Sequence, residues 1–301
     1  MTVTPSSLRR RKLWMAAIKP PMYSVAMMPI WLGTAIARTQ VLAINWGIFA
    51  IFLAAAIAIL AWLNLSNDVF DSQTGIDKNK AHSVVNLTGN AKGVLAIANL
   101  LLAAGILGIV AIAWWQRDGT VLGIVAACCA LGYTYQGPPF RLGYLGLGEP
   151  ICWLTFGPMA IAAVYYSQTQ TWSWTSLPAA CLLGLSTSLI LFCSHFHQVE
   201  DDLAAGKRSP VARMGTAAGA RVVAAIISVF FGSLFVFVAL GWMPLWTLLA
   251  IASLPPAVRL SRLMLRYHSF PRQISEAKFI AVAFHFWTSL LLGLGYWLAV
   301  P

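Results

Sequence analysis

Residues 46–77 read WGIFAIFLAAAIAILAWLNLSNDVFDSQTGID, and this stretch decides the class of fold. No charged side chain occurs in it before Asp68, and Asp71 and Asp77 follow close behind. An uncharged apolar run of about 20 residues is long enough to cross a bilayer as a helix. Acidic side chains at the edge of a membrane are costly and usually functional. The stretch therefore predicts a membrane-spanning helix with a functional site at its carboxyl end.

The composition of the whole chain leads to the same fold class. Of the 301 residues, 59% are hydrophobic and 10% are charged, whereas soluble domains carry roughly 25% charged residues. We therefore expect an all-α membrane protein with about nine transmembrane helices, forming a single domain over residues 1–301. The candidate spans are residues 20–38, 46–70, 93–115, 120–136, 149–166, 177–198, 219–241, 243–264 and 278–299.

The positive charges indicate an orientation. If the basic segment 1–19 is cytoplasmic and the spans alternate, only Arg38 and Arg117 of the 20 basic residues fall outside the cytoplasmic side. Cytoplasmic loops of membrane proteins collect Lys and Arg, so we expect the amino terminus and the loops after the even-numbered spans in the cytoplasm. Because these charges lie in short loops between apolar runs, the net charge of +11 does not indicate a nucleic-acid partner.

Two of the expected cytoplasmic loops are acidic. Six of the nine acids lie in them: Asp68, Asp71, Asp77, Glu200, Asp201 and Asp202. Asn64, Asp68 and Asp71 are spaced i, i+4 and i+7, so they share one face of a helix. Gathered carboxylates repel one another unless cations lie between them, and Mg²⁺ prefers a few carboxylates together with substrate phosphate. The acids therefore predict a Mg²⁺ site in which all six are candidate ligands.

Basic residues follow both acidic clusters. They are Lys78, Lys80, Lys207, Arg208 and Arg213. Carboxylates, a metal ion and basic side chains together are typical of a diphosphate site, since the metal bridges acid to phosphate and the cations neutralise the remaining charge. The alternative is that both loops are solvated segments that only mark topology. That alternative explains the basic residues, but it does not explain acids aligned on one helix face.

The segments after the two clusters also resemble each other. Residues 82–89 (HSVVNLTG) and 208–215 (RSPVARMG) share the pattern S-x-V-x-x-x-G. The similarity is consistent with an internal duplication, of the kind that places a shared site between two repeats. The alternative is a chance similarity of two short loops.

A third polar stretch, YTYQGPPFRLGYLGLGE, occupies residues 133–149. The candidates for lining an aromatic or isoprenoid pocket are Tyr133, Tyr135, Phe140 and Tyr144, and Arg141 is a candidate for reaching the diphosphate. The alternative is a Gly- and Pro-rich turn with interfacial aromatic residues, which membrane proteins commonly have. Three histidines flank the acidic motifs and either act on a phenolic substrate or satisfy local hydrogen bonds. These are His82, His195 and His197.

These motifs together resemble the UbiA-type intramembrane prenyltransferases, in the branch that prenylates 1,4-dihydroxy-2-naphthoate. NDVFDSQTGID at 67–77 is similar to the first aspartate-rich motif of that branch, and YTYQGPPFRLGYLGLGE to its Tyr-, Gly- and Pro-containing segment. IKPPMYSVAMMPIWLGTAIA at 18–37 resembles its first-helix signature, with Lys19 at a usually basic position. DKNKAHSVVNLTGN at 77–90 and FCSHFHQVEDDLAAGKRSP at 192–210 look like the phylloquinone-making members. The resemblance covers nearly the whole chain.

The resemblance implies a helical bundle around a central cavity, in a multi-pass protein of the inner or thylakoid membrane. It implies transfer of a phytyl group from phytyl diphosphate to 1,4-dihydroxy-2-naphthoate, with loss of carbon dioxide and with Mg²⁺ as cofactor. Catalytic roles are expected for Asp68, Asp71, Asp202 and Lys207. Substrate contacts are expected from Lys19, Asn64, Lys78, Lys80, Tyr133, Arg141, His197, Gln198, Arg208 and Arg213.

The second motif departs from the family pattern. Many members have Asn and Asp ahead of its final Asp, but here the stretch reads SHFHQVEDD, which puts Gln198 at the usual Asp position. Glu200 and Asp202 match acidic positions. If the sixth helix continues this far, Gln198 and Asp202 lie one turn apart on one face. The amide of Gln198 is then expected to offer a neutral oxygen to Mg²⁺ or a hydrogen bond to phosphate.

Other functions remain open at this point. One alternative is a prenyltransferase with other substrates: a longer polyprenyl donor, as in menaquinone synthesis, or another acceptor ring such as homogentisate. An alternative from a different class of protein is a secondary transporter, because transporters are also built from repeats around a midplane site. A transporter should carry charged or broken helices at the bilayer centre, whereas here nearly all charge is expected at one face.

Overall fold

The protein is described by a computed structural model for residues 5–41, 43–76 and 83–300, with side chains from residue 11 onward. These residues form helices and connecting segments, without a β-strand. The expected site residues Asp77, Lys78 and Lys80, and also His82, lie outside the described residues. In chain order the helices are α1 Pro5–Ile18, η1 Pro20–Tyr23, α2 Ser24–Ala37, α3 Trp46–Thr74, α4 Val84–Thr88, α5 Ala91–Gln116, α6 Thr120–Gln136, η2 Leu142–Leu145, α7 Gly148–Leu154, η3 Thr155–Met159, α8 Ala160–Thr169, η4 Trp174–Ser176, α9 Leu177–His195, α10 Val199–Ala204, α11 Pro210–Met214, α12 Thr216–Ala239, η5 Leu245–Ser253, α13 Leu254–Tyr267 and α14 Ala277–Leu298.

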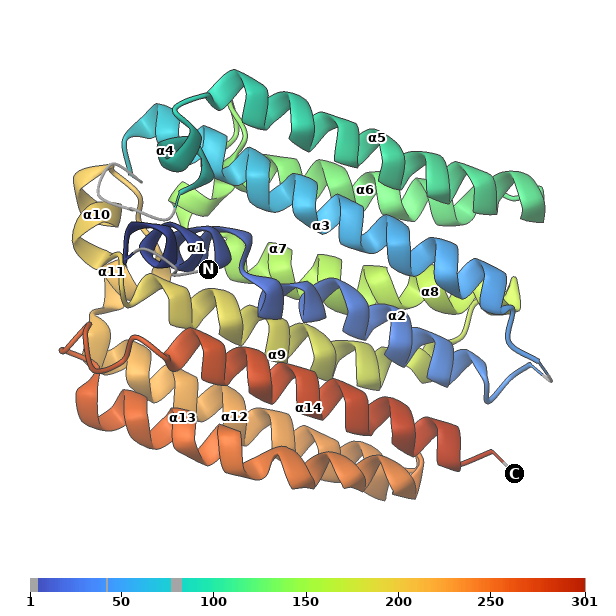
Figure 1. Cartoon of the computed structure of the whole chain (residues 1–301). Helices are drawn as coiled ribbons and strands as arrows, with labels where there is room; N and C mark the ends of the chain where they lie inside the picture. The colour runs from blue at the N-terminus through green and yellow to red at the C-terminus, as the bar shows by residue number, and fades with distance from the viewer. Residues whose placement is uncertain (1–4, 42, 77–82, 301) are drawn as a thin grey trace.

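The axes of the long helices lie roughly parallel to one another, and α3 and α5 run in opposite directions (Figure 1). The short helices α1, α4, α10 and α11 gather at one end of the long helices. Within the described residues, six helical segments are long and apolar enough to cross a membrane. Helices α2 and α6 have 14 and 17 residues, fewer than the about 20 that a span usually needs. The segment from α7 to α8 is interrupted by η3, a π-helical turn. The all-helical prediction is confirmed with six candidate spans, and the number of nine stays a prediction.

Helix α3 carries the first acidic motif to the end of the bundle. It begins after Asn45, whose side-chain oxygen accepts a hydrogen bond from the Ile48 N–H at 3.1 Å. It ends at Gly75, whose φ of 77° lies in the left-handed region that favours glycine. At 1.5 Å per residue, the 29 residues of α3 extend about 44 Å, against about 30 Å for the hydrocarbon core of a bilayer. The surplus length is enough to bring Asp68 and Asp71 to the membrane surface.

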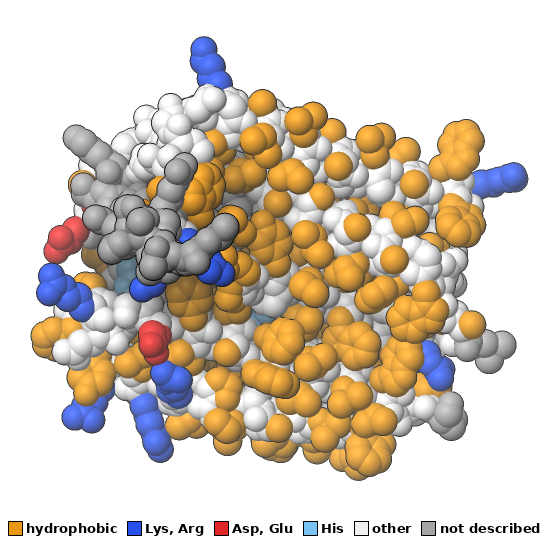
Figure 2. All heavy atoms as spheres, in the orientation of Figure 1, with side chains coloured by type: hydrophobic (Ala, Val, Ile, Leu, Met, Phe, Trp, Pro, Cys, Tyr) orange, Lys and Arg blue, Asp and Glu red, His pale blue; other side chains and the backbone are white. Residues whose placement is uncertain are grey.

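The helices differ in how much of their surface is covered by protein. In the segment Trp174–His195, which contains α9, 78% of the most apolar stretch of 18 residues is buried inside the protein. The corresponding share for α5 is 22%. Leu100 and Leu107 on α5 are 70% and 67% exposed. Water-soluble proteins rarely expose apolar surface on this scale, so α5 is expected to face lipid while α9 lies at the centre. Apolar side chains cover the middle of the molecule, and most Lys and Arg lie at the end with the short helices (Figure 2).

Candidate active site

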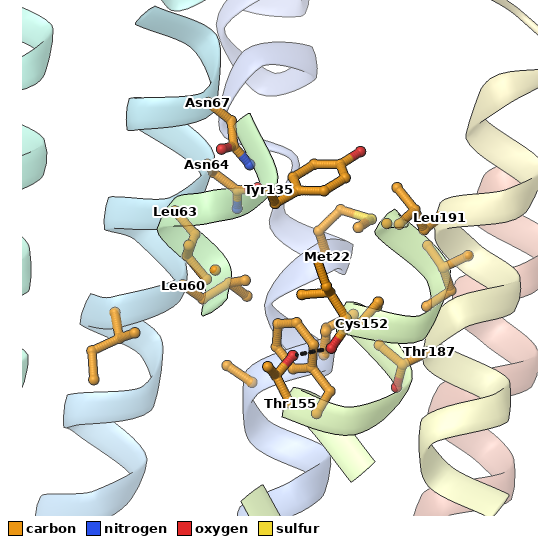
Figure 3. Close-up of a pocket in the computed structure, with 18 of the residues that line it drawn as sticks. Met22, Leu60, Leu63, Asn64, Asn67, Tyr135, Cys152, Thr155, Thr187 and Leu191 are labelled. Carbon is orange, nitrogen blue, oxygen red and sulfur yellow. Dashed lines mark hydrogen bonds between the residues drawn. The ribbon is translucent and has the colours of Figure 1, made fainter. Parts of the chain in front are cut away.

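A cavity of about 310 Å³ lies between α2, α3, α6, α7, α8 and α9. Its inner part is lined mainly by apolar side chains such as Leu60, Leu63 and Cys152, whereas Asn64 and Asn67 lie at its outer part (Figure 3). The polar and charged residues around the outer part are Lys19, Asn64, Asn67, Asp68, Asp71, Tyr135, Gln136, His195, Gln198, Lys207 and Lys278. The cavity therefore joins a charged mouth to an apolar chamber.

The α3 wall carries the residues whose helical spacing predicted a shared face. Asn64, Asp68 and Asp71 all line the cavity. Asp68 is 7% exposed, and its Oδ2 accepts hydrogen bonds from the Ser83 hydroxyl at 2.8 Å and the Val85 N–H at 3.0 Å. These donors belong to the first turn of α4, so α4 orients the Asp68 carboxylate at the cavity mouth.

Helix α6 adds Gln136, which the sequence did not single out, and Tyr135, which was among the expected pocket residues. Gln136 is buried, and its amide donates a hydrogen bond to the Asp71 carboxylate. Tyr135 lines the cavity, but Tyr133, the expected substrate contact, does not. Instead, the Tyr133 hydroxyl donates to the Pro138 carbonyl at 2.7 Å. Residues two apart on a helix point in different directions, so the helical phase of this segment was the signal that only one of the two tyrosines faces the cavity.

The second acidic motif is arranged differently from the expectation. Helix α9 ends at His195 and α10 begins at Val199, so the sixth span is not a continuous helix through Gln198. Gln198 lines the cavity, but Asp202 is 0% exposed and does not line it. Asp202 therefore lies behind the wall that it was expected to form.

Asp202 contacts the side chains of Lys207 and His195, which do line the cavity. Its Oδ1 lies 3.5 Å from Lys207 Nζ, and its Oδ2 lies 3.6 Å from His195 Nδ1. The other ring nitrogen of His195, Nε2, lies 3.1 Å from Glu149 Oε1. Burial alone would raise the pKa of Asp202, but His195 and Lys207 outweigh it and hold the pKa below its usual value. This network of four ionisable groups joins α7, α9, α10 and the loop after α10.

Sequence reasoning did not assign a role to Glu149 and left His195 undecided. Both lie in motifs that had been singled out, Glu149 at the end of YLGLGE and His195 in SHFHQVEDD. His195 is 3% exposed and lines the cavity. A histidine a few residues before a run of acids is a signal for such a pair, but only the tertiary structure shows which acids it contacts.

Three arginines that were expected to contact the diphosphate do not line the cavity. Arg213 is exposed and donates to the carbonyls of Arg208, at 2.9 Å, and Leu145, at 2.7 Å. The Arg208 N–H donates to the Tyr144 carbonyl at 2.9 Å, and the Arg141 guanidinium lies 6.0 Å from the centre of the Tyr144 ring. The Arg213 side chain and the Arg208 N–H therefore join the η2 segment to the loop before α11, whereas Arg141 contacts Tyr144 within the η2 segment.

The remaining expected residues of the second motif also lie outside the cavity wall. Glu200 is exposed on α10, and neither Glu200 nor Asp201 lines the cavity. His197 is half-buried, and burial together with the charge of Lys278 lowers its pKa. Lys19, by contrast, lines the cavity, and its φ of 50° is a left-handed backbone conformation unusual for a residue with a side chain.

The two similar loops of the sequence also have similar local structure. Helices α4 and α11 each have five residues, preceded by Ser83 and Ser209 respectively. They end at Gly89 and Gly215, whose φ angles are 64° and 80°. Each short helix follows one acidic motif and lies at the same end of the bundle (Figure 1). The likeness in structure is what an internal duplication would leave.

The donors at the cavity mouth fit a magnesium ion. Asp68 and Asp71 supply carboxylate oxygens, and Asn64 and Asn67 supply amide oxygens, from one helix. Among the described residues, no three His, Cys, Asp or Glu side chains are already grouped to hold a metal. Mg²⁺ usually binds through one or two carboxylates together with water and substrate phosphates, so this donor set suits an ion that arrives with a diphosphate.

Comparisons with known proteins agree with this geometry. The model of the UbiA prenyltransferase family matches residues 26–290. The chain is 57% identical to a 2-carboxy-1,4-naphthoquinone phytyltransferase of Synechocystis sp., covering 95% of this chain and 93% of that one. It is 41% identical to the chloroplastic enzyme of the same name from Arabidopsis thaliana, with 95% and 77% covered. A UbiA homolog from Archaeoglobus fulgidus, solved with DMAPP and Mg²⁺, has the same fold, with a TM-score of 0.59 at 12% identity over 93% of this chain and 98% of that one. The chain belongs to the UbiA prenyltransferase family.

Proposed function

We propose that this protein transfers a phytyl group from phytyl diphosphate to 1,4-dihydroxy-2-naphthoate, with loss of the ring carboxyl as carbon dioxide. The observation that carries the proposal is the cavity, in which a mouth of carboxylates and ammonium groups opens into an apolar chamber. The names of the relatives from Synechocystis and Arabidopsis support phytyl as the transferred group and a naphthalenoid acceptor. Mass spectrometry of the products formed by purified protein from mixed donors and acceptors tests the proposal.

The residues at the mouth would bind the donor headgroup. Asp68 and Asp71, with Asn64, would hold Mg²⁺, which when bound neutralises charge on the diphosphate leaving group. Lys207 lines the opposite side of the mouth and would donate hydrogen bonds to diphosphate oxygens. This charge compensation favours breaking the allylic C–O bond, whose electron pair leaves with diphosphate.

The apolar chamber would receive the phytyl chain and protect the reaction from water. A carbocation left after C–O cleavage is quenched by water, and a closed cavity inside the bilayer excludes water. The electron-rich ring attacks the cation and forms the new C–C bond. The carboxylate then leaves as carbon dioxide, and its electron pair restores the aromatic ring.

The inner end of the chamber supports a tail of limited length. On α3 the cavity is lined from Asp71 back to Phe52, and Ile30 and Ala163 line it from α2 and α8. At 1.5 Å per residue, Phe52 lies about 24 Å along the axis from Asp68. Beyond Ile30 the helices α2 and α8 touch, because a Cβ added to Gly33 would lie 2.8 Å from the Val164 Cβ. This contact between α2 and α8 closes the cavity on that side, which supports a four-unit tail over an eight-unit one.

Replacing Phe52 with alanine should allow longer tails to enter. We expect the ratio of turnover with octaprenyl diphosphate to turnover with phytyl diphosphate to rise about tenfold or more, since pocket size discriminates on this scale. Because the ratio is measured within each variant, loss of folded protein does not affect it. Phe49→Ala is the matched control, since Phe49 lies on α3 but does not line the cavity. An unchanged ratio in Phe52→Ala would show that Phe52 does not limit the tail.

We further propose that the charged end of the bundle faces the cytoplasm and that the chain crosses the membrane nine times. The gathering of Lys and Arg at that end supports the orientation. In a cysteine-free background, cysteines at Thr88 and Ala204 should react with an impermeant maleimide only from the cytoplasmic side, and a cysteine at Thr171 only from the other side. Thr88, Ala204 and Thr171 are exposed. Reaction of positions 88 and 204 from opposite sides would refute this topology.

A further inference from the structure

Arginines are concentrated on one of the six described segments that are long and apolar enough to cross a membrane. The segment Leu245–Tyr267 contains Arg259, Arg262 and Arg266, whereas none of the other five segments contains more than one Lys or Arg. Membrane proteins collect Lys and Arg in their cytoplasmic loops. That rule explains a basic residue at the end of each span, but it does not explain three arginines along a single span.

The three arginines share the face of α13 that points away from the bundle. They are spaced i, i+3 and i+7, which places them on one side of a helix. The buried residues of α13 have the same spacing on the opposite side: Ala257, Leu260 and Met264. This buried side packs against α12 and α14, and α13 lies at the edge of the bundle (Figure 1). All three arginines are exposed, so they face the surroundings of the protein.

A groove along this outer face combines the arginines with apolar surface. Arg259, Arg262 and Arg266 line it together with Leu254, Val258 and Leu263. Arg266 is one residue from the end of α13, at the end of the bundle that carries the short helices. At 1.5 Å per residue, Leu254 lies about 18 Å from Arg266 along the helix axis. The groove therefore runs from a charged end at the membrane surface to an apolar end in the hydrocarbon core.

Two of the three arginines have no acidic partner in the described part of the chain. Arg259 pairs with Glu276 at 2.8 Å, but neither Arg262 nor Arg266 forms an ion pair with a described carboxylate. A cationic side chain at the edge of the hydrocarbon core is costly unless an anion or water meets its charge. The planar guanidinium group matches the oxygens of a phosphate in pairs. Arg262 and Arg266, one turn apart, are therefore suited to a phosphate at headgroup depth.

We propose that this groove binds an anionic phospholipid of the surrounding bilayer, with its phosphate between Arg262 and Arg266. One acyl chain then lies along Leu263, Val258 and Leu254. The polarity of the groove matches that of a lipid, and its positive charge favours a headgroup with a net negative charge. A zwitterionic headgroup carries an ammonium group that the arginines repel. None of the groove residues lines the cavity of the candidate active site, so the proposal does not depend on the identity of the substrates.

A lipid titration followed by native mass spectrometry tests the site. Delipidated full-length protein in a neutral detergent would receive phosphatidylglycerol or phosphatidylcholine with the same acyl chains. We expect one phosphatidylglycerol to bind at least about tenfold more tightly than phosphatidylcholine, the effect of two cationic side chains on one anionic headgroup. Equal affinities for the two lipids would overturn the proposal.

Two double variants separate a specific site from general attraction by positive charge. Arg262→Gln combined with Arg266→Gln should weaken phosphatidylglycerol binding about tenfold or more and leave phosphatidylcholine binding unchanged. Arg221→Gln combined with Arg272→Gln is the matched control, because it removes the same charge from exposed positions outside the groove. All four side chains are exposed, so both double variants should fold like the wild type. Equal loss of phosphatidylglycerol affinity in the two double variants would contradict a site in the groove.

Inorganic phosphate distinguishes a lipid site from a site for phosphate alone. Excess phosphate should leave the bound phosphatidylglycerol in place in the wild-type protein, because phosphate cannot occupy the apolar part of the groove. Displacement of the lipid by equimolar phosphate would show that the arginines bind phosphate without selecting a lipid, and would overturn the assignment.

Discussion

Replacing Asp71 with alanine should lower turnover by about 10²–10³-fold, the usual effect of removing one group that stabilises developing charge. Asp71 lines the cavity beside Asp68 and accepts a hydrogen bond from the buried amide of Gln136. Its loss removes a charge from the α3 wall and leaves Gln136 without that partner. The variant should still fold, because Asp71 lies near the end of α3 and not in the apolar core. Steady-state turnover of purified protein measures the effect.

Asp118→Ala is the control for the Asp71 prediction. Asp118 lies between α5 and α6, at the end opposite to the cavity mouth, where it accepts hydrogen bonds from the Tyr166 hydroxyl and the Thr120 N–H. Removing this carboxylate should leave turnover close to that of the wild type. Comparable turnover in Asp71→Ala and wild-type protein would be incompatible with a metal–diphosphate site on α3.

Asp202→Ala should reduce both stability and activity. Asp202 and Lys207 have side-chain exposures of 0% and 5%, so the substitution leaves a buried ammonium group without its counter-charge. Breaking a buried ion pair from one side typically costs about 3–5 kcal/mol. Turnover should fall as well, because Lys207 is no longer held at the cavity mouth. Denaturant unfolding in a fixed detergent, together with turnover of the remaining folded protein, measures both effects.

Glu276→Ala provides the comparison for Asp202→Ala. Glu276 pairs with Arg259 at 2.8 Å, but both side chains are about two-thirds exposed. Exposed ion pairs contribute little to stability, so this variant should unfold near the wild-type midpoint. If Asp202→Ala were as stable and as active as Glu276→Ala, the buried network would have neither of the roles assigned to it here.

The α3 side of the site could be predicted from sequence because its geometry is local. Asn64, Asp68 and Asp71 lie within two turns of one helix, so their spacing alone places them on one face. The apolar run before them fixes both the helix and its relation to the membrane. The partners of this face could not be predicted, because Ser83 and Gln136 come from other helices and reach it only through tertiary packing.

The second motif shows where local reasoning fails. The expected pairing of Gln198 with Asp202 on the cavity face assumed a helix without a break, but α9 ends at His195 and α10 starts at Val199. The break turns Gln198 toward the cavity while Asp202 is buried behind it. The Glu149 contact depends on the packing of α7 against α9, which no short sequence pattern encodes. The resemblance to a family predicted the fold and the chemistry, but it could not show that Glu200, Asp201 and Asp202 lie outside the cavity wall.

Analysis of the products would show directly which group this protein transfers and to which ring. Purified protein in lipid vesicles would receive phytyl and octaprenyl diphosphate in equal amounts, with 1,4-dihydroxy-2-naphthoate labelled at the carboxyl carbon, and with either Mg²⁺ or EDTA. We expect a phytylated naphthalenoid product that lacks the carboxyl group, one labelled carbon dioxide released per product, and no product in EDTA until Mg²⁺ is restored. A preference for the octaprenyl donor, a product that keeps the carboxyl group, or full activity in EDTA would contradict it.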